Sequence, residues 1–282
     1  MNLLVADAGG TKTEWRLVRS GAPPLAFRTD GFNANLEPMS DMVRRLTEEV
    51  RPRLPVPPEA VHFYGAAFST EEYCSAWAEA LRRVLEAPTA TAEHDLLGAA
   101  RAAALGKPAV VCILGTGSNS CYFDGQYIVE QRGGHGYIFG DHGSGADLGR
   151  RLLADVLDGE APRPLAEAFT SVYGSPKEVR NQTYRHPKPS VFLASLVKFL
   201  IDHPGEYIDS LVATAFSDFL NRTVLRYRRP EPVYFVGSLA KQFEGILVRV
   251  CAENGLNVGG FVPHPIDRLV EFHAGQENKA VP

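Results

Sequence analysis

Two short glycine-rich segments carry the groups best suited to chemistry in this chain. "DAGGTKT" begins at Asp7, directly after an apolar run, and "LGTGSNS" begins at Leu114, the last residue of another apolar run. A glycine turn after a strand leaves backbone N–H groups free and lets a ligand approach without a Cβ in the way, which suits phosphate. The candidate phosphate-binding residues are Gly9, Gly10, Thr11, Lys12, Thr13, Gly115, Thr116, Gly117, Ser118 and Asn119.

Asp7 stands where the first apolar run ends, so its carboxylate is placed to hold a cation beside the glycine turn. Magnesium keeps several of its waters and takes few carboxylates, and we therefore expect Asp7 to bind it partly through water. Either glycine segment alone is equally consistent with an ordinary tight hairpin. Together, one in each half of the chain, they indicate a site that holds a polyphosphate.

The elements around these segments follow one plan twice. The patterns predict strands at 2–7, 13–19 and 25–29, and again at 109–114, 119–123 and 127–130, so each half opens with a three-stranded meander. Asp124-Gly125 is a strong hairpin signal within the second meander. A duplicated domain follows as the working model. Further predicted strands are 61–64, 232–236 and 256–262, and predicted helices are 73–84, 96–105, 146–157, 191–201, 207–227 and 239–253.

Strands that alternate with long helices predict an α/β architecture. We expect a first domain at 1–105 and a second at 106–282, with a last helix at about 265–275 that packs back on the first domain. "STEE" from Ser69 has the spacing of a capping box before the helix at 73–84, and "RPRLPVPP" from Arg51 is expected to be a loop.

Composition excludes several classes of partner. The formal net charge is -4 with mixed signs, which gives no basic stripe for nucleic acid and no polybasic patch for a membrane. No apolar stretch approaches membrane-spanning length, and the N-terminus lacks the features of a signal peptide, so we expect a cytoplasmic protein. The four cysteines have no paired spacing that would indicate disulfides or zinc. Small soluble ligands are the expected partners, and a homodimer is compatible with the sequence.

Four motifs, "ADAGGTKTEW", "LGTGSNS", "GDHGSGADLG" and "YFVGS", occur in the order found in the actin-like ATPase superfamily that includes hexokinase. Over nearly its whole length the chain most resembles the N-acetylglucosamine kinase branch of the BadF/BadG/BcrA/BcrD ATPase family. The resemblance implies two ribonuclease-H-like domains with ATP and Mg²⁺ in an interdomain cleft. It also implies that the glycine segments are the two phosphate loops and that Gly237 and Ser238 contact adenosine.

Phosphoryl transfer to an alcohol requires a carboxylate that accepts the hydroxyl proton. Asp95 opens a predicted Ala-rich helix, where the simplest explanation is a helix-start residue favoured by the helix dipole. In the sugar kinases that the chain resembles, a "D-x-x-x-A" segment at this place carries the catalytic base. Asp95 matches it.

The resemblance also implies a set of sugar contacts. Asp141 lies in the glycine-rich "GGHGYIFGDHGSG", where it either bonds its own loop or, as in similar kinases, contacts sugar hydroxyls. His135 and His142 depart from the tryptophan and glutamate that relatives have at these places, which leaves the identity of the sugar open. The expected substrate-binding residues are Asn35, Thr116, Gly134, His135 and Asp141.

Three functions remain open from the sequence. The first is an ATP-dependent kinase that acts on N-acetylglucosamine, giving its 6-phosphate, or on N-acetylmuramic acid. The second is an ATPase that energises electron transfer to a radical dehydratase, which would need paired cysteines for an iron–sulfur cluster. The third is a non-catalytic sugar or nucleotide sensor, because a fold does not fix a function.

Overall fold

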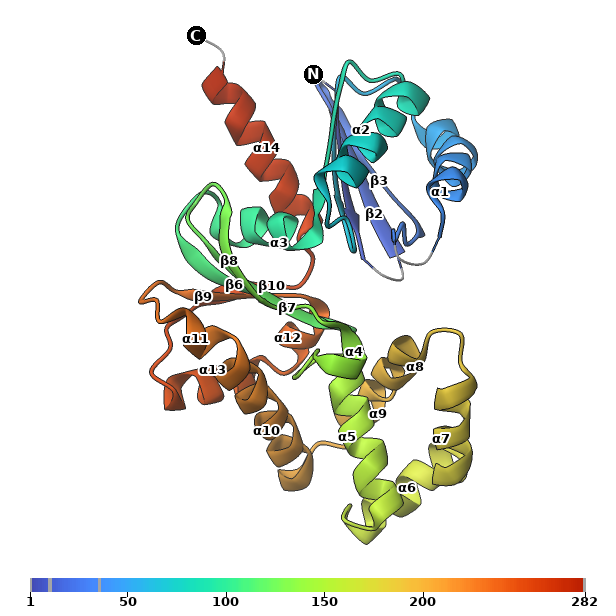
Figure 1. The fold of residues 1–282 in the computed structure, drawn as a ribbon, viewed down its shortest axis with the longest axis vertical. Coiled ribbons are helices and arrows are strands. Elements are labelled where there is room, and N and C mark those ends of the chain that lie inside the picture. The colour runs from blue at the N-terminus through green and yellow to red at the C-terminus, as the bar shows by residue number, and fades with distance from the viewer. Residues whose placement is uncertain (1, 10–11, 35–36, 281–282) are drawn as a thin grey trace. The chain divides into compact units, whose positions relative to one another are not determined.

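The structure is a computed structural model that describes residues 2–9, 12–34 and 37–280 (Figure 1). The chain divides into two compact units. The first comprises Met1–Lys107, Gly125–Tyr127 and His264–Pro282, and the second comprises Pro108–Asp124 and Ile128–Pro263. A domain boundary at 105/106 stays a prediction. No helix formed by the described residues is long and apolar enough to cross a membrane.

The first unit is built on a five-stranded mixed sheet. Strands β1 (Asn2–Ala8), β2 (Lys12–Arg19) and β3 (Ala22–Asp30) form the predicted antiparallel meander. Strands β4 (Ala60–Gly65) and β5 (Thr89–His94) extend the sheet in parallel on the other side of β1. The strand order is therefore β3-β2-β1-β4-β5.

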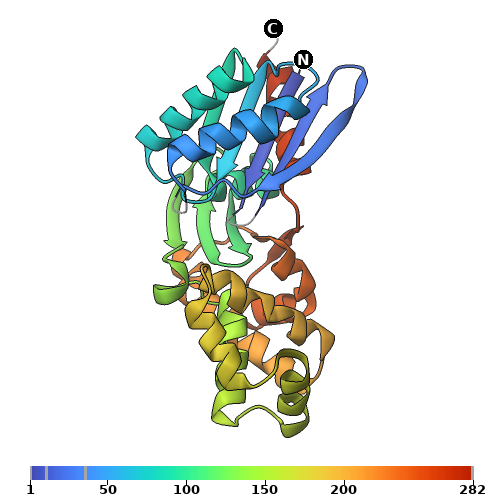
Figure 2. The same cartoon turned by 90° about the vertical axis from the view of Figure 1, so that its right-hand side faces the viewer.

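Helices cover both faces of this sheet, because successive residues of β1 point to opposite sides. Leu4 and Ala6 pack on one side with helices α1 (Met39–Arg45) and α2 (Glu71–Leu85), while Leu3 and Val5 pack on the other with α3 (Asp95–Ala104) and α14 (Ile266–Ala280). Figure 1 shows the sheet between these two pairs of helices, and Figure 2 shows α1 and α2 in front of it. The helical segments are α1 (Met39–Arg45), a π-helical turn (Leu46–Val50), a 3₁₀ turn (Arg51–Arg53), α2 (Glu71–Leu85), α3 (Asp95–Ala104) and α14 (Ile266–Ala280).

The start of α2 corrects one detail of the sequence analysis. The N-cap residue is Thr70, whose Oγ1 accepts a hydrogen bond from the backbone N–H of Tyr73 at 3.2 Å. The helix therefore begins one residue later than a capping box from Ser69 requires. Glu72 is the second helical residue and not the third, so the predicted capping box does not form. Thr and Ser cap helices almost equally well, so the sequence alone does not choose between neighbours.

The second unit repeats the same sheet. Strands β6 (Ala109–Leu114), β7 (Ser118–Phe123) and β8 (Ile128–Gly133) form an antiparallel meander, and β9 (Val233–Val236) and β10 (Val258–Val262) extend it in parallel. The order β10-β9-β6-β7-β8 is that of the first unit read from the opposite edge. The duplicated α/β plan predicted from the sequence is confirmed.

Three long helices predicted in this unit are broken into pairs. The break between α10 and α11 falls at Thr223, whose Oγ1 donates to the carbonyl of Phe219 at 2.6 Å, a bond that competes with regular helix geometry. Short helices at 136–139, 163–173 and 176–185 were not predicted. The helices are α4 (Gly136–Phe139), α5 (Gly145–Asp158), α6 (Arg163–Tyr173), α7 (Pro176–Arg185), α8 (Pro189–Ser195), α9 (Val197–Asp202), α10 (Glu206–Arg222), α11 (Val224–Tyr227), α12 (Ser238–Gln242) and α13 (Glu244–Glu253).

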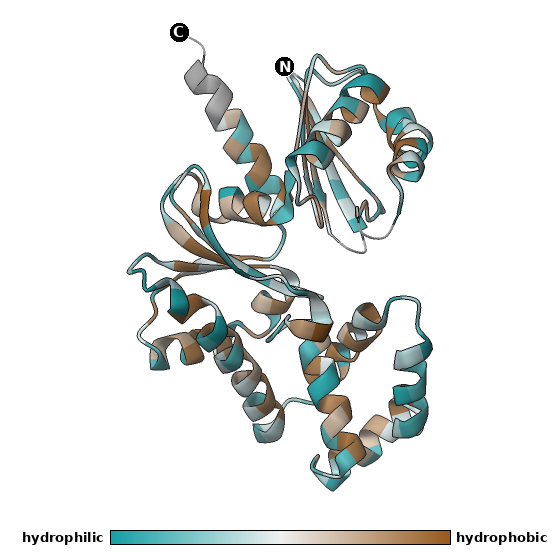
Figure 3. Ribbon diagram, in the orientation of Figure 1, coloured by the Kyte–Doolittle hydropathy of each residue, from teal (hydrophilic) through white to brown (hydrophobic). Residues whose placement is uncertain are grey.

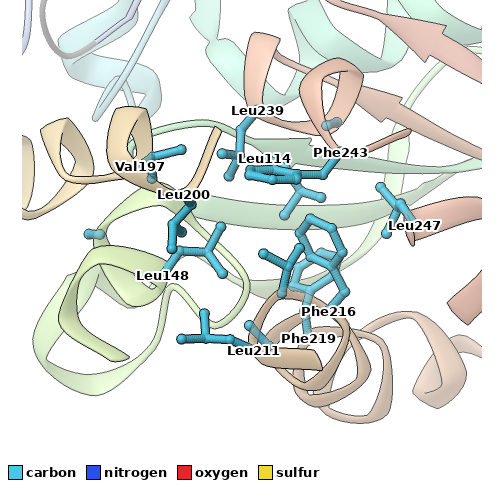
Figure 4. Close-up of a cluster of buried hydrophobic side chains, with 14 of the residues drawn as sticks. Leu114, Leu148, Val197, Leu200, Leu211, Phe216, Phe219, Leu239, Phe243 and Leu247 are labelled. Atoms are coloured by element: carbon cyan, nitrogen blue, oxygen red, sulfur yellow. The ribbon is translucent and has the colours of Figure 1, made fainter. Parts of the chain in front are cut away.

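An apolar core fills the space between the second sheet and its helices. Figure 4 shows Leu114 from the end of β6 beside Leu239 and Phe243, with Phe216 from α10 close to them. All four are buried. The core therefore anchors the strand end from which the "LGTGSNS" turn begins. In Figure 3 most helices of this unit show brown and teal stripes, as expected for helices with one buried face.

Candidate active site

The first glycine segment forms the turn between β1 and β2, as predicted. Ala8 pairs with Thr13 at the end of the two strands, and the N–H of Gly9 donates to the carbonyl of Lys12 at 3.0 Å. The predicted phosphate-binding residues Gly10 and Thr11, and the predicted sugar contact Asn35, lie outside the described residues.

Three carboxylates gather beside this turn. Strand register places Asp7 opposite Glu14, and the ends of β1, β4 and β5 lie at one edge of the sheet because Ala8 pairs with Gly65 and Gly65 with His94. Asp95 follows β5 directly as the first residue of α3. The sheet thus brings together two residues, Asp7 and Asp95, that are 88 positions apart in the chain.

Asp7 is poised between its two protonation states near neutral pH. Burial raises the pKa of Asp7 to about 7, and the negative charges of Asp95 and Glu14 act in the same direction against the opposing charge of Lys12. A cation at this point would relieve that repulsion. Among the described residues, no three histidine, cysteine or carboxylate side chains are arranged so that they could together hold a metal ion. A metal here would take most of its ligands from water and phosphate, which is the coordination that Mg²⁺ accepts.

Glu14 is a candidate site residue that the sequence analysis missed. Its side chain is 6% exposed, and its carboxylate lies 3.0 Å from the Lys12 amine and 2.7 Å from the Arg28 guanidinium. Burial alone would raise the pKa of Glu14, but the hydrogen bond and charge of Lys12 and the charge of Arg28 lower it. Glu14 therefore stays ionised and holds the Lys12 amine. The available signal was Lys12 and Arg16, which flank Glu14 at the two-residue spacing of one strand face.

The second glycine segment is the turn between β6 and β7. The N–H of Gly115 donates to the carbonyl of Gly117 at 3.0 Å, which closes the turn. The carbonyls of Gly115 and Thr116 accept hydrogen bonds from Gly145 and Ala146, in the first turn of α5. The turn is consequently fixed to the start of a long helix.

Asp141 joins the two glycine-rich segments of the second unit. Its backbone has φ +55°, and its Oδ1 accepts a hydrogen bond from the N–H of Ser118 at 3.2 Å. Burial raises the pKa of Asp141, and the bond from Ser118 opposes that shift. The hydroxyl of Ser118 also donates to the carbonyl of His142 at 2.8 Å. The Asp141 carboxylate thus bonds an amide beside the candidate phosphate loop, whereas the simpler interpretation expected a bond to its own loop.

Two more of the predicted site residues, Gly134 and Gly237, lie against the turn between β6 and β7. Gly134 donates its N–H to the carbonyl of Ser118 at 3.2 Å. A Cβ on Gly134 would lie only 2.7 Å from the side-chain nitrogen Nδ2 of Asn119, so the site has no room for one. Gly237 has φ +118° and leaves no room for a Cβ, which would lie 2.3 Å from the carbonyl of Leu114. Ser238 follows as the first residue of α12. His135 is exposed at the start of α4.

A cavity of about 270 Å³ adjoins Asp141. Its walls are partly apolar, and helix α4, which is brown in Figure 3, carries the exposed side chains of Ile138 (69%) and Phe139 (82%). Asp147 on the polar side is neutralised by Arg150 at 2.6 Å and Arg151 at 3.0 Å. The lining residues are Tyr137, Ile138, Phe139, Gly140, Asp141, His142, Ala146, Asp147, Arg150 and Leu193.

Comparison with solved structures decides the family. A provisionally assigned N-acetylglucosamine kinase from Porphyromonas gingivalis is 38% identical, with a TM-score of 0.91 over 98% of this chain and 99% of the other. The chain belongs to the N-acetylglucosamine kinase-like family. The resemblance inferred from the four motifs is thereby confirmed.

Two further comparisons are at lower identity. A glucosamine kinase from Vibrio cholerae is 27% identical over 196 residues, which span 64% of this chain and 63% of the relative. A ROK family glucokinase from Streptomyces griseus, solved with glucose and AMPPNP, is 12% identical with a TM-score of 0.56 over 96% of this chain and 98% of the other. The second comparison shows the shared two-domain fold alone. No protein-family model matches the chain.

Proposed function

We propose that this protein transfers the γ-phosphoryl group of ATP to a hydroxyl of an amino sugar. N-acetylglucosamine is the first candidate acceptor, at its C6 hydroxyl, and glucosamine and N-acetylmuramic acid are the alternatives. The observation that carries the proposal is the placement of Asp7 and Asp95 at one sheet edge beside the first glycine turn. The names of the family members from Porphyromonas gingivalis and Vibrio cholerae support the same class of acceptor.

The proposed roles follow from the chemistry of phosphoryl transfer, in which positioning and charge neutralisation supply most of the catalysis. Lys12 and the amides of both glycine turns bind the nucleotide phosphates, and Gly237 and Ser238 contact the adenosine. Asp7 would hold Mg²⁺, and the ion would supply positive charge against the phosphates. Asp95 accepts the proton of the sugar hydroxyl as its oxygen attacks phosphorus.

Asp141 is the proposed sugar contact in the second unit. A carboxylate can accept hydrogen bonds from two sugar hydroxyls. Burial raises the pKa of Asp141, and hydroxyl donors from a bound sugar would stabilise its ionised form. Asn35, Thr116, Gly134 and His135 complete the proposed set.

The burial of the cysteines argues against an electron-transfer ATPase. Cys112 and Cys121 are fully buried on β6 and β7, and burial raises the pKa of both thiols. A cluster at a subunit interface needs accessible thiolates. These two residues are instead part of the sheet's packing.

An ATP-consumption assay across a panel of amino sugars tests the proposal. The panel contains N-acetylglucosamine, glucosamine and N-acetylmuramic acid, with glucose and a no-sugar well as controls. We expect ADP release that depends on one amino sugar and stops when EDTA removes Mg²⁺. Equal ADP release in every well, the no-sugar well included, would show an ATPase instead of a sugar kinase.

A further inference from the structure

The residue before the proposed base makes an unusual contact. His94 is the N-cap of α3, and its Nδ1 lies 2.7 Å from Oδ1 of Asp95. The same Nδ1 lies 3.0 Å from the backbone nitrogen of Leu96. Both the imidazole and the carboxylate are 27% exposed, so the pair is partly shielded from water.

One ring nitrogen cannot serve both neighbours at once. A bond from the Leu96 N–H needs a lone pair on Nδ1, whereas a carboxylate at 2.7 Å needs a proton there, since two lone pairs would repel. A hydrogen bond to an ionised carboxylate is roughly twice as strong as one between neutral groups. Although the Leu96 N–H points at Nδ1, the shorter contact with Asp95 favours the form with the proton on Nδ1.

The charges around the pair agree with this assignment. Burial lowers the pKa of His94, but the hydrogen bond and the charge of Asp95 outweigh it and raise the pKa above its usual value. Asp95 and Glu14 both place negative charge against Asp7 on β1, and Lys12 opposes them, so Asp95 and Asp7 repel each other. A proton donor beside Asp95 offsets that repulsion.

We propose that His94 is a positioning residue for Asp95, donating from Nδ1 to Oδ1 so that Oδ2 is the oxygen that accepts the proton of the acceptor hydroxyl. This inference rests on the proposed sugar kinase activity. In that step the O–H bond breaks, its proton passes to Oδ2, the hydroxyl oxygen bonds phosphorus, and ADP leaves with the electrons of the broken P–O bond. His94 keeps its proton throughout and fixes the rotation of the carboxylate.

Two substitutions separate positioning from helix capping. Asparagine and serine both cap helices well, but the asparagine amide N–H extends as far from the backbone as Nδ1 of His94, whereas the serine hydroxyl is one bond shorter. We expect His94→Ser to lower kcat about 10- to 100-fold with little change in either KM, because small displacements of a reacting group cost rates of that size. His94→Asn should recover at least part of that loss. Equal kcat values in the two variants would overturn the proposal and leave helix capping as the only role of His94. An equal loss of kcat that is accounted for by lower melting temperatures would overturn it in the same way.

A spectroscopic measurement tests the pair without any sugar. NMR titration of the imidazole of His94 in the full chain should show its pKa falling in Asp95→Asn, because the negative partner is lost. An unchanged titration would overturn the pairing itself. Failure of the parent to use any amino sugar would instead overturn the proposed function, so the two failures are distinguishable.

Discussion

Oδ1 of Asp141 lies 3.2 Å from the backbone nitrogen of Ser118 and accepts its hydrogen bond. This bond connects the proposed sugar contact with the second proposed phosphate loop. The other carboxylate oxygen, Oδ2, lies where a Cβ on Gly117 would approach to 2.8 Å. The absence of a side chain at Gly117 therefore permits the position of Asp141.

Gly117→Ala should displace the Asp141 carboxylate and weaken sugar binding. Hydrogen bonds to a charged group contribute about 1.5–3 kcal/mol each, so loss of one sugar contact should raise the KM for sugar about 10- to 100-fold. Steady-state kinetics with each substrate varied in turn measure this effect. Gly245→Ala on α13 is the control, because a Cβ there meets no described protein atom within 4 Å and Gly245 has no part in the proposed site. A similar rise in sugar KM for both variants would contradict the proposed role of Gly117.

Asp7→Asn should weaken binding of Mg²⁺-ATP far more than binding of metal-free ATP. Because the pKa of Asp7 is raised to about 7, Mg²⁺ must displace a proton below that pH. The affinity of the parent for Mg²⁺-ATP should fall by up to about tenfold per pH unit below 7, and that of the variant should not. Calorimetry at pH 6 and pH 8 measures both. Parent-like affinity and pH dependence in Asp7→Asn would exclude Asp7 as the metal ligand.

The same substitution has a predicted effect on stability. A folded-state pKa of about 7 against an ordinary value of 3.8 means that the folded protein binds more protons between these pH values. The free energy of unfolding therefore falls as pH rises through that window. Asparagine removes this loss, so metal-free Asp7→Asn should melt at a higher temperature than the parent above pH 7.

Most strands could be predicted from the sequence, whereas several residues that contact the proposed site residues could not. The two meanders carry strong signals, since apolar runs end in glycine turns, and their positions were correct to within a few residues. Strand β5, which positions Asp95, was missed because "TATAEH" contains no large apolar residue. The roles of Glu14 and His94 depend on contacts with Lys12, Arg28 and Asp95 that no local pattern encodes. Helix breaks such as that at Thr223 depend on one side-chain bond.

A stacked histidine pair predicts acid sensitivity of the first unit. The rings of His62 on β4 and His273 on α14 are stacked at 3.6 Å, and Nε2 of His273 lies 2.7 Å from the hydroxyl of Tyr64. Burial, with the charge of Arg101, lowers the pKa of His62 to about 4. Burial, with the charges of His62 and Arg101, lowers that of His273 to about 3. The packing of α14 therefore requires neutral rings.

Folded-state pKa values below the ordinary 6.5 contribute stability that is present above pH 6.5 and is lost as pH falls through about 4 and then 3. His62→Phe keeps an aromatic ring but cannot titrate. The free energy of unfolding of the parent should fall between pH 7 and pH 4, and on the order of 3 kcal/mol of that fall should be absent in this variant. Denaturant unfolding at both pH values measures it. The same loss in parent and variant would show that His62 does not couple to folding.

The most direct test of the account is the product and rate of the reaction with and without the carboxylate of Asp95. Asparagine can keep a hydrogen bond to the acceptor hydroxyl but cannot take its proton. Phosphorus NMR and steady-state kinetics should show an amino sugar 6-phosphate from the parent. Asp95→Asn should form the same product about 10²–10⁴-fold more slowly, with both KM values changed much less. ADP without sugar phosphate from the parent, or near-parent turnover by Asp95→Asn at an unchanged melting temperature, would contradict the account.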